Sequence, residues 1–244
     1  MTSRSAGGPV SDLAAATAFL TVVGGARRPT AGALGWFPIV GALVGAAVGL
    51  VWWGVAELWP PLVAAVLVVG VDAVVTGAVH HDGLADSADG LLPHLDRDRR
   101  LEVMAAPDVG GFGVVTVVVT IGLRVAVLAV IEPDPLVLAA VWSASRTAMA
   151  VVARSQPYAR GEGLASSFLG GSPWSVLTLG AIVSAVLVTP SGVPGLVGLA
   201  SLIAVTIAVT WLARRRLGGF TGDVLGAIGV LGETAALLAL AANW

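Results

Sequence analysis

The chain has 244 residues, of which 57% are hydrophobic and 11% are charged, and its mean hydropathy is +0.92. A soluble domain carries about 25% charged residues, so this composition excludes an ordinary soluble protein and indicates an integral membrane protein. Its apolar runs have the length of helices and do not suit a β-barrel, so we expect an all-α fold. The net charge of −2 gives no reason to expect nucleic acid as a partner, and without cysteine there is no disulfide or thiol chemistry.

The N-terminal segment differs from a cleavable signal peptide. Arg4 precedes a Gly-Gly-Pro stretch, and the apolar run over 13–23 is too short to cross a bilayer. We expect an interfacial helix there, capped by Ser11 or Asp12.

Seven later stretches are long enough, or nearly so, for the roughly 20 residues of a membrane span. They predict a polytopic bundle of about seven transmembrane helices, at 34–56, 61–80, 111–131, 136–154, 174–190, 193–212 and 222–241. The weakest are 174–190, which is the shortest, and 222–241, which contains Asp223 and Glu233. In the first span Gly41, Gly45 and Gly49 form a stripe of small residues that predicts close helix packing.

All 13 basic residues are arginine, and their distribution predicts the topology. With a cytoplasmic N-terminus and seven spans, every arginine outside the spans lies on the cytoplasmic side, as the positive-inside rule requires. These residues are Arg4, Arg27, Arg28, Arg97, Arg99, Arg100, Arg154, Arg160, Arg214, Arg215 and Arg216. We therefore expect a multi-pass protein of a bacterial cytoplasmic membrane, with an extracytoplasmic C-terminus.

The sequence indicates one membrane domain over 1–244. Its expected partners are the lipid bilayer and the small-molecule substrates, and the sequence does not decide whether the chain forms a homo-oligomer. Three longer segments, 81–110, 155–173 and 213–223, are predicted on the cytoplasmic face. The first contains seven of the 15 acidic residues of the chain. Within it, 96–104 predicts a short helix capped by Asp96.

The most informative motif follows the second predicted span. Asp82, Asp86 and Asp89 have the i, i+4, i+7 spacing that places side chains on one face of a helix. Like charges so placed repel unless a cation neutralises them, and carboxylate oxygens suit Mg²⁺ bridging to phosphates. Asp223 is a candidate fourth ligand, and His80 is a candidate base or a partner that orients Asp82.

Candidate phosphate-binding groups lie on the same predicted face. Arginine binds phosphate bidentately, and glycine-rich turns at 110–113 and 217–223 expose backbone amides. The candidate arginines are Arg97, Arg99, Arg100, Arg154 and Arg160, for which a role in topology and lipid binding is the alternative. Carboxylates, arginines and glycine turns together favour phosphoryl transfer, which depends on positioning and charge neutralisation.

Four ionisable residues lie well inside predicted spans, away from the span ends: Asp72, Arg124, Arg146 and Glu233. Buried charges need partners, so we expect Asp72 to pair with one of these arginines. Arg146 is predicted to point inward, towards Asp82, Asp86 or a bound phosphate.

The motif His80-x-Asp82-Gly-Leu-Ala-Asp86-x-x-Asp89-Gly resembles the signature of the cobalamin synthases, also called adenosylcobinamide-GDP ribazoletransferases. Further similar motifs follow in the family's order along the chain. They are Trp36-Phe37-Pro38-Ile39-Val40-Gly41, Arg97-Asp98-Arg99-Arg100-Leu101-Glu102-Val103-Met104, Ser145-Arg146, Tyr158-Ala159-Arg160 with Glu162-Gly163-Leu164, Gly218-Gly219-x-Thr221-Gly222-Asp223, and Gly232-Glu233. The resemblance thus covers most of the chain.

The resemblance implies Mg²⁺-dependent transfer of the adenosylcobinamide-phosphate group from adenosylcobinamide-GDP to α-ribazole or α-ribazole 5′-phosphate. GMP would leave, and adenosylcobalamin or its 5′-phosphate would form, in the last steps of cobalamin biosynthesis. The expected catalytic residues are Asp82, His80 and Arg146, and the expected Mg²⁺ ligands are Asp82, Asp86, Asp89 and Asp223. The expected substrate-binding residues are Arg97, Arg99, Arg100, Arg160, Glu162, Gly218, Gly219, Thr221 and Gly222.

The chain departs from the family pattern at 105–108. A basic residue and Asp-Ser usually follow there, whereas this chain has Ala105, Ala106 and Pro107, with Asp108 two positions late. The nearest alternative is a membrane phosphotransferase of the CDP-alcohol type, whose motif begins like Asp86-x-x-Asp89-Gly but is not continued here. An intramembrane prenyltransferase would need Asn-Asp-x-x-Asp motifs on two helices, and this chain lacks the second. A transporter would not explain why the acidic residues crowd one face.

Overall fold

The computed structural model describes residues 8–25, 27, 30–160 and 173–242. Its helices are α1 (Pro9–Leu20), η1 (Ala33–Trp36), α2 (Phe37–Ala56), α3 (Pro61–Val75), α4 (Val79–Leu91), α5 (Arg97–Val103), α6 (Gly111–Leu128), α7 (Pro135–Ser155), α8 (Pro173–Val188), η3 (Thr189–Ser191), α9 (Gly192–Leu217) and α10 (Gly222–Leu240). The described part contains no strand beyond one isolated bridge between Tyr158 and Phe220. The predicted all-α fold is confirmed.

Among the described residues, five helical segments are long and apolar enough to cross a membrane: Ala33–Ala56, Gly111–Leu128, Pro135–Ser155, Thr189–Leu217 and Gly222–Leu240. A sixth is counted if α3 and α4 together form one broken span. The chain is therefore a polytopic membrane bundle. α8, in the region of the shortest predicted span, is an apolar helix of 16 residues, below the length of a full span.

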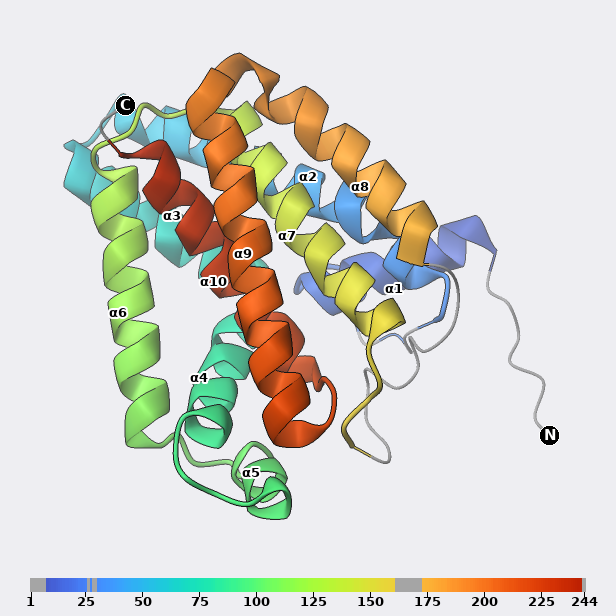
Figure 1. The fold of residues 1–244 in the computed structure, drawn as a ribbon. Coiled ribbons are helices and arrows are strands. Elements are labelled where there is room, and N and C mark those ends of the chain that lie inside the picture. The colour runs from blue at the N-terminus through green and yellow to red at the C-terminus, as the bar shows by residue number, and fades with distance from the viewer. Residues whose placement is uncertain (1–7, 26, 28–29, 161–172, 243–244) are drawn as a thin grey trace.

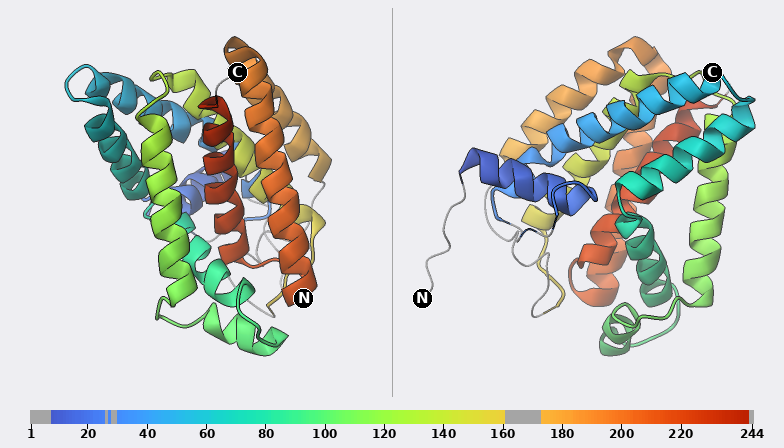
Figure 2. Two further views of the ribbon diagram at one scale, coloured as in Figure 1. Left: turned by 60° about the vertical axis from the view of Figure 1, so that its left-hand side comes forward. Right: turned by 180° about the vertical axis from the view of Figure 1, so that it is seen from behind.

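The two ends of the bundle differ (Figures 1 and 2). α4, α5, the first turn of α6 and the turn between α9 and α10 gather at one end, which we call the aspartate end. The α2–α3 and α6–α7 connections and η3 lie at the opposite end. The spanning helices thus run back and forth between these two ends.

α1 confirms the predicted N-terminal helix, but its predicted caps are wrong. The helix begins at Pro9 with Gly8 as N-cap and no side-chain cap, so Ser11 and Asp12 lie within its first turn. The Asp12 carboxylate instead accepts a hydrogen bond from the Thr30 hydroxyl at 2.7 Å. By contrast, Asp96 caps α5 as predicted, since its side chain accepts from the Arg99 amide at 2.9 Å.

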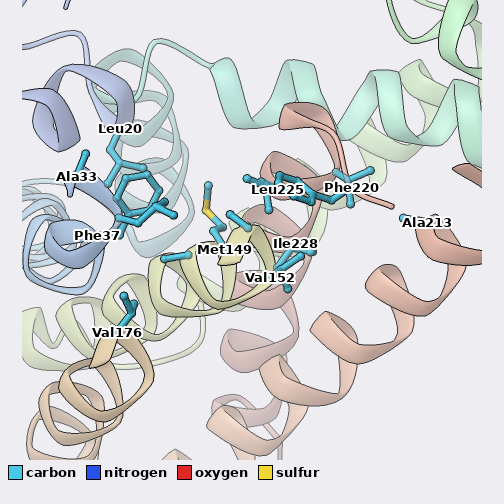
Figure 3. Close-up of a cluster of buried hydrophobic side chains, with 14 of the residues drawn as sticks. Leu20, Ala33, Phe37, Met149, Val152, Val176, Ala213, Phe220, Leu225 and Ile228 are labelled. Carbon is cyan, nitrogen blue, oxygen red and sulfur yellow. The ribbon is translucent and has the colours of Figure 1, made fainter. Parts of the chain in front are cut away.

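A hydrophobic core near α1 joins the N-terminal segment to the rest of the bundle. Figure 3 shows Leu20 and Phe37 near Met149 on α7, with Leu225 and Ile228 on α10 beyond it. All five side chains are buried. Burial of apolar side chains of this size stabilises by about 1.5–3 kcal/mol each, so this cluster holds α1, α2, α7 and α10 together.

The predicted glycine stripe of the first span packs closely against α7. A Cβ atom added at Gly41 would meet the Trp142 carbonyl, and one added at Gly45 or Gly49 would meet the backbone of Leu138 or Pro135. Larger residues would force the helices apart, so the packing interpretation of this stripe is confirmed.

The second predicted span does not run straight through 61–80. α3 ends at Val75, and α4 begins at Val79 at an angle of 89° to it. Gly77 and Ala78 both have positive φ, 62° and 54°, and consecutive left-handed residues cannot continue a right-handed helix. The sequence prediction failed here because the run is almost wholly apolar up to Val79 and only Gly77 marks the break.

The bend at Gly77 and Ala78, which we call the α3–α4 corner, allows a comparison of two glycine substitutions with opposite expected effects on stability. Gly77→Ala should destabilise by about 1–2 kcal/mol, because alanine is strained in the left-handed region and its Cβ would lie 3.0 Å from Val22 Cγ1. Gly70→Ala, within α3 and with open space around its Cβ, should stabilise by up to about 1 kcal/mol. Thermal unfolding in detergent measures both, and a Gly77→Ala protein as stable as wild type would contradict the prediction.

Candidate active site

α4 and α10 bring the predicted aspartates from distant parts of the chain together. A Cβ atom added at Gly83 would lie 2.9 Å from the Asp223 carbonyl oxygen, and one added at Gly226 would lie 3.1 Å from that of His80. The two helices can approach this closely because both positions are glycine. The corner after α3 makes this packing possible, since it turns α4 towards the first turn of α10.

Asp86 lies at the centre of the resulting group of charges. Its carboxylate is within electrostatic range of Asp223, Asp82 and Arg160. Arg160 donates from Nη2 to Asp223 Oδ2 at 2.9 Å and to the Met104 carbonyl at 3.1 Å. Asp82 is exposed, whereas Asp86, Arg160 and Asp223 are partly buried, so the group opens to the surface at the aspartate end.

Asp89 has a different role from the one predicted. It is buried, and its carboxylate accepts hydrogen bonds from the amides of Gly110 at 2.7 Å and Gly113 at 2.9 Å. A Cβ at either glycine would collide with this carboxylate. Asp89 therefore holds the N-terminus of α6, and these amides are unavailable to phosphate. Asp89 was expected as a Mg²⁺ ligand beside Asp82, Asp86 and Asp223, but in this structure both of its carboxylate oxygens accept backbone amides instead.

The remaining carboxylates are compatible with a magnesium ion that is completed by substrate. Among the described residues, no group of three or more histidine, aspartate and glutamate side chains is arranged to hold a metal ion. Mg²⁺, however, is usually held by one or two carboxylates together with water and substrate phosphates. Asp82, Asp86 and Asp223 lie within electrostatic range of one another, so one or two of these carboxylates together with substrate phosphates would meet that requirement.

Two of the five predicted phosphate-binding arginines hold backbone segments in place. Arg97 donates to the carbonyls of Leu217 at 2.9 Å and Ala159 at 2.8 Å, and Arg100 donates to those of Gly90 at 2.7 Å and Leu91 at 3.1 Å. Burial, reinforced by the neighbouring Arg216, lowers the pKa of Arg100, but a guanidinium remains charged in proteins. Arg100 and Arg216, which also contacts the Leu91 carbonyl, thus supply positive charge at the C-terminus of α4.

Two other predicted arginines lie outside the group around Asp86. Arg99 is exposed and pairs with Glu102 at 2.9 Å along α5. Arg154 donates to Ser175 Oγ at 3.3 Å and to the Ala31 carbonyl at 3.4 Å. Arg160 is therefore the predicted arginine that the described structure places against the aspartates.

The second glycine turn connects this arginine to α10. Gly218, with a φ of 79°, ends α9, and Phe220 exchanges backbone hydrogen bonds with the 157–159 segment at 2.9 and 2.8 Å. A Cβ at Gly219 would collide with the Pro157 carbonyl. Thr221 then caps α10 by accepting from the Val224 amide at 3.3 Å, with Gly222 as the first helical residue. Glu162 lies outside the described residues.

His80 is buried, and it makes no hydrogen bond to the Asp82 carboxylate. Neither ring nitrogen of His80 or of His81 has a hydrogen-bond partner among the described residues. The charged groups within electrostatic range of His80 are Arg146, Glu233 and Arg124. The structure therefore gives no hydrogen bond through which His80 would orient Asp82.

The intramembrane charges form a buried network across four helices. Arg124 on α6 pairs with Asp72 on α3 at 3.2 Å and with Glu233 on α10, and Glu233 also pairs with Arg146 on α7. The expected pairing of Asp72 with an arginine is confirmed. Arg146 does have an acidic partner, but the prediction of Asp82 or Asp86 is wrong, since that partner is Glu233.

Neutral side chains complete this network, and the sequence analysis missed them. Trp142 Nε1 donates to Asp72 at 3.0 Å, Ser145 Oγ donates to Glu233 at 2.6 Å, and Arg124 Nε donates to Thr234 at 2.9 Å. Each buried charge thus has several partners, as low-dielectric surroundings require. The only signal in the sequence was the spacing of four residues between Trp142 and Arg146, and ordinary helix packing shows the same spacing.

The fold and site define the chain as a polytopic membrane protein with a carboxylate- and arginine-lined site at one end of the bundle. Residues 12–241 match the cobalamin-5-phosphate synthase family, and the chain belongs to that family. A Bradyrhizobium diazoefficiens protein called adenosylcobinamide-GDP ribazoletransferase is 37% identical, over 96% of this chain and 94% of its own length.

Two enterobacterial relatives have the same name. One from Escherichia coli O17:K52:H18 is 38% identical and one from Shigella boydii serotype 4 is 39% identical, each over 84% of this chain and 85% of its own length. No solved structure matches the chain.

The two aspartate environments on α4 predict different effects of the same substitution. Asp89→Asn should destabilise by about 1–3 kcal/mol, because one carboxylate oxygen becomes an NH₂ group that faces an amide donor of α6. Asp82→Asn, at an exposed position, should leave the unfolding midpoint unchanged. Thermal unfolding in detergent tests this contrast. Equal unfolding midpoints for the two variants would refute it.

The buried network predicts a charge-balance effect. Arg146→Met should destabilise by about 3–5 kcal/mol, because it leaves two buried carboxylates with one arginine. Adding Glu233→Gln restores a neutral network, so the double variant should be more stable than Arg146→Met alone. Arg215→Met, at the exposed end of α9, is the matched control. A double variant less stable than the single one would contradict this account.

Proposed function

We propose that the protein transfers the adenosylcobinamide-phosphate group of adenosylcobinamide-GDP to α-ribazole or α-ribazole 5′-phosphate in a Mg²⁺-dependent reaction. GMP is released, and adenosylcobalamin or its 5′-phosphate is formed. Membership of the cobalamin-5-phosphate synthase family and the names of the relatives support this reaction. The observation that carries the proposal is the meeting of the α4 carboxylates, Asp223 of α10 and Arg160 at one accessible place.

The site suits a diphosphate substrate because it combines metal-binding oxygens with a guanidinium. Mg²⁺ bound there would neutralise charge on the diphosphate and on the leaving GMP. Asp82, Asp86 and Asp223 are the residues that would hold it. Asp89 contributes indirectly, by fixing α6 against α4 through the amides of Gly110 and Gly113.

Arg160 is the residue that we expect to bind phosphate directly. Its Nη2 is shared between Asp223 and the Met104 carbonyl, and its side chain is 26% exposed. A guanidinium has five N–H donors, so others remain for phosphate oxygens. The contact with Asp223 also orients this carboxylate, which couples the phosphate-binding group to the proposed metal ligand.

The orientation of the site follows from the arginine distribution. Arg97, Arg99, Arg100, Arg160 and the three arginines at the C-terminus of α9 all lie at the aspartate end. The positive-inside rule assigns this end to the cytoplasm. We therefore place the site on the cytoplasmic face of the bacterial inner membrane, where nucleotide substrates are found.

The direct test measures GMP release by the purified full-length protein from adenosylcobinamide-GDP and α-ribazole. We expect GMP and the corrinoid product in equal amounts with Mg²⁺, and neither after chelation by EDTA. Parallel reactions with α-ribazole 5′-phosphate show which acceptor is used. No GMP with either acceptor, or release unaffected by EDTA, would refute the proposal.

Asp82→Asn tests the metal-binding role. The substitution keeps the shape of the side chain but removes its charge, so turnover should fall below about a tenth of wild type while the protein stays folded. Asp98→Asn, exposed on α5 at the same end, is the matched control and should retain activity. Activity of Asp82→Asn above about a tenth of wild type would remove Asp82 from the proposed ligands.

A further inference from the structure

A large apolar groove lies on the side of the bundle, away from the aspartates. Its volume is about 710 Å³, and it lies between α8 and α9 with α7 as its floor. α8 and α9 meet at η3 and diverge towards the aspartate end (Figure 1). Its lining consists mostly of small and apolar side chains, among them Val151, Leu177, Ala181 and Ile207. The volume lies within the range of small-molecule sites, but this groove opens on the lipid-facing side.

The groove has a charged mouth at the aspartate end. Trp211 and Arg214 line this mouth, and the guanidinium of Arg215 lies 4.2 Å from the centre of the Trp211 ring. Arg214 donates to Gln156 Oε1 at 3.4 Å, a contact with a neutral group. No carboxylate lines the groove or pairs with Arg214 or Arg215 in the described part of the chain. The mouth is therefore positively charged.

The position of the mouth matches the membrane interface. Tryptophan and arginine are enriched at this level, with rings and stems in the apolar layer and polar groups towards water. From Arg214 the lining extends along α9 to Leu199, fifteen residues away and about 22 Å deep at 1.5 Å per residue. This depth exceeds half of a hydrocarbon core of about 30 Å. A long apolar chain with an anionic head at its interfacial end fits this shape and charge.

We propose that the groove binds one anionic phospholipid, with its phosphate at Arg214 and an acyl chain between α8 and α9. A zwitterionic lipid fits less well, because no described carboxylate at the mouth would pair with its cationic group. The groove is also connected to the aspartates by a short stretch of sequence. Gln156 at the mouth leads directly into the 157–160 segment, which pairs with Phe220 and carries Arg160. Bound lipid would thus stabilise the segment that positions Arg160.

Native mass spectrometry of the full-length protein tests the proposal. The protein is reconstituted in phosphatidylcholine vesicles with or without phosphatidylglycerol, and then released into a mild neutral detergent. We expect one phosphatidylglycerol retained per chain, in preference to phosphatidylcholine. The unfolding midpoint should also rise when phosphatidylglycerol is added back to delipidated protein.

Two variants separate the head and chain contacts. Arg214→Gln removes the charge and should reduce phosphatidylglycerol retention about tenfold, the effect of one charge-assisted contact. Ala181→Phe fills the groove from α8 and should abolish retention of either lipid. Arg27→Gln, an exposed arginine elsewhere, and Ala204→Phe, exposed on α9 but outside the groove, should retain lipid like wild type.

Several outcomes would overturn the proposal. One is equal retention of the two lipids by wild type, and another is undiminished retention by Ala181→Phe. A dimer that Ala181→Phe dissociates would assign the groove to a second copy of the chain. Because lipid retention is measured without substrate, failure of this proposal is distinguishable from failure of the proposed ribazole transfer.

Discussion

The buried ion network of Asp72, Arg124, Glu233 and Arg146 is the constraint on which the arrangement of the bundle depends. Each residue comes from a different helix, α3, α6, α10 or α7, and a charge in such surroundings is costly without its partners. The four helices can therefore associate with low energy only in the register that joins these charges. Apolar packing alone would allow helices to slide, because their lipid-facing and protein-facing surfaces are similar.

This register also sets the geometry of the candidate active site. α10 contributes Glu233 to the network and, ten residues earlier, Asp223 to the site. Fixing the middle of α10 thus fixes the height of its first turn, against which α4 packs through Gly83 and Gly226. Because the chain bends at Gly77 and Ala78, Asp72 on α3 can lie in the network while the aspartates of α4 face α10. The network consequently acts as a positioning element for the site without contacting it.

The aspartate end shows how identical residue types acquire different roles. Asp86 faces other carboxylates and Arg160, whereas Asp89, one turn away, accepts two backbone amides of α6. Likewise, Arg160 contacts Asp223, whereas Arg97 and Arg100 join backbone carbonyls of separate segments. Glycines at 110, 113, 218 and 219 are required by close approach or by a left-handed turn, so their presence in the sequence does not by itself indicate phosphate binding.

The sequence alone determined the class of fold and most of the spans, because hydropathy is a local property of the chain. It also determined the Asp96 cap of α5, which is a local interaction, and the need of Asp72 for an arginine, because a buried charge requires a partner. It also determined the family, through motifs spread over most of the chain. Only the tertiary structure decided that α3 and α4 meet at 89°, that Glu233 is the partner of Arg146, and that Asp89 holds α6. These outcomes depend on which helices become neighbours, and helical periodicity gives the face of a residue but not the partner that the face will meet.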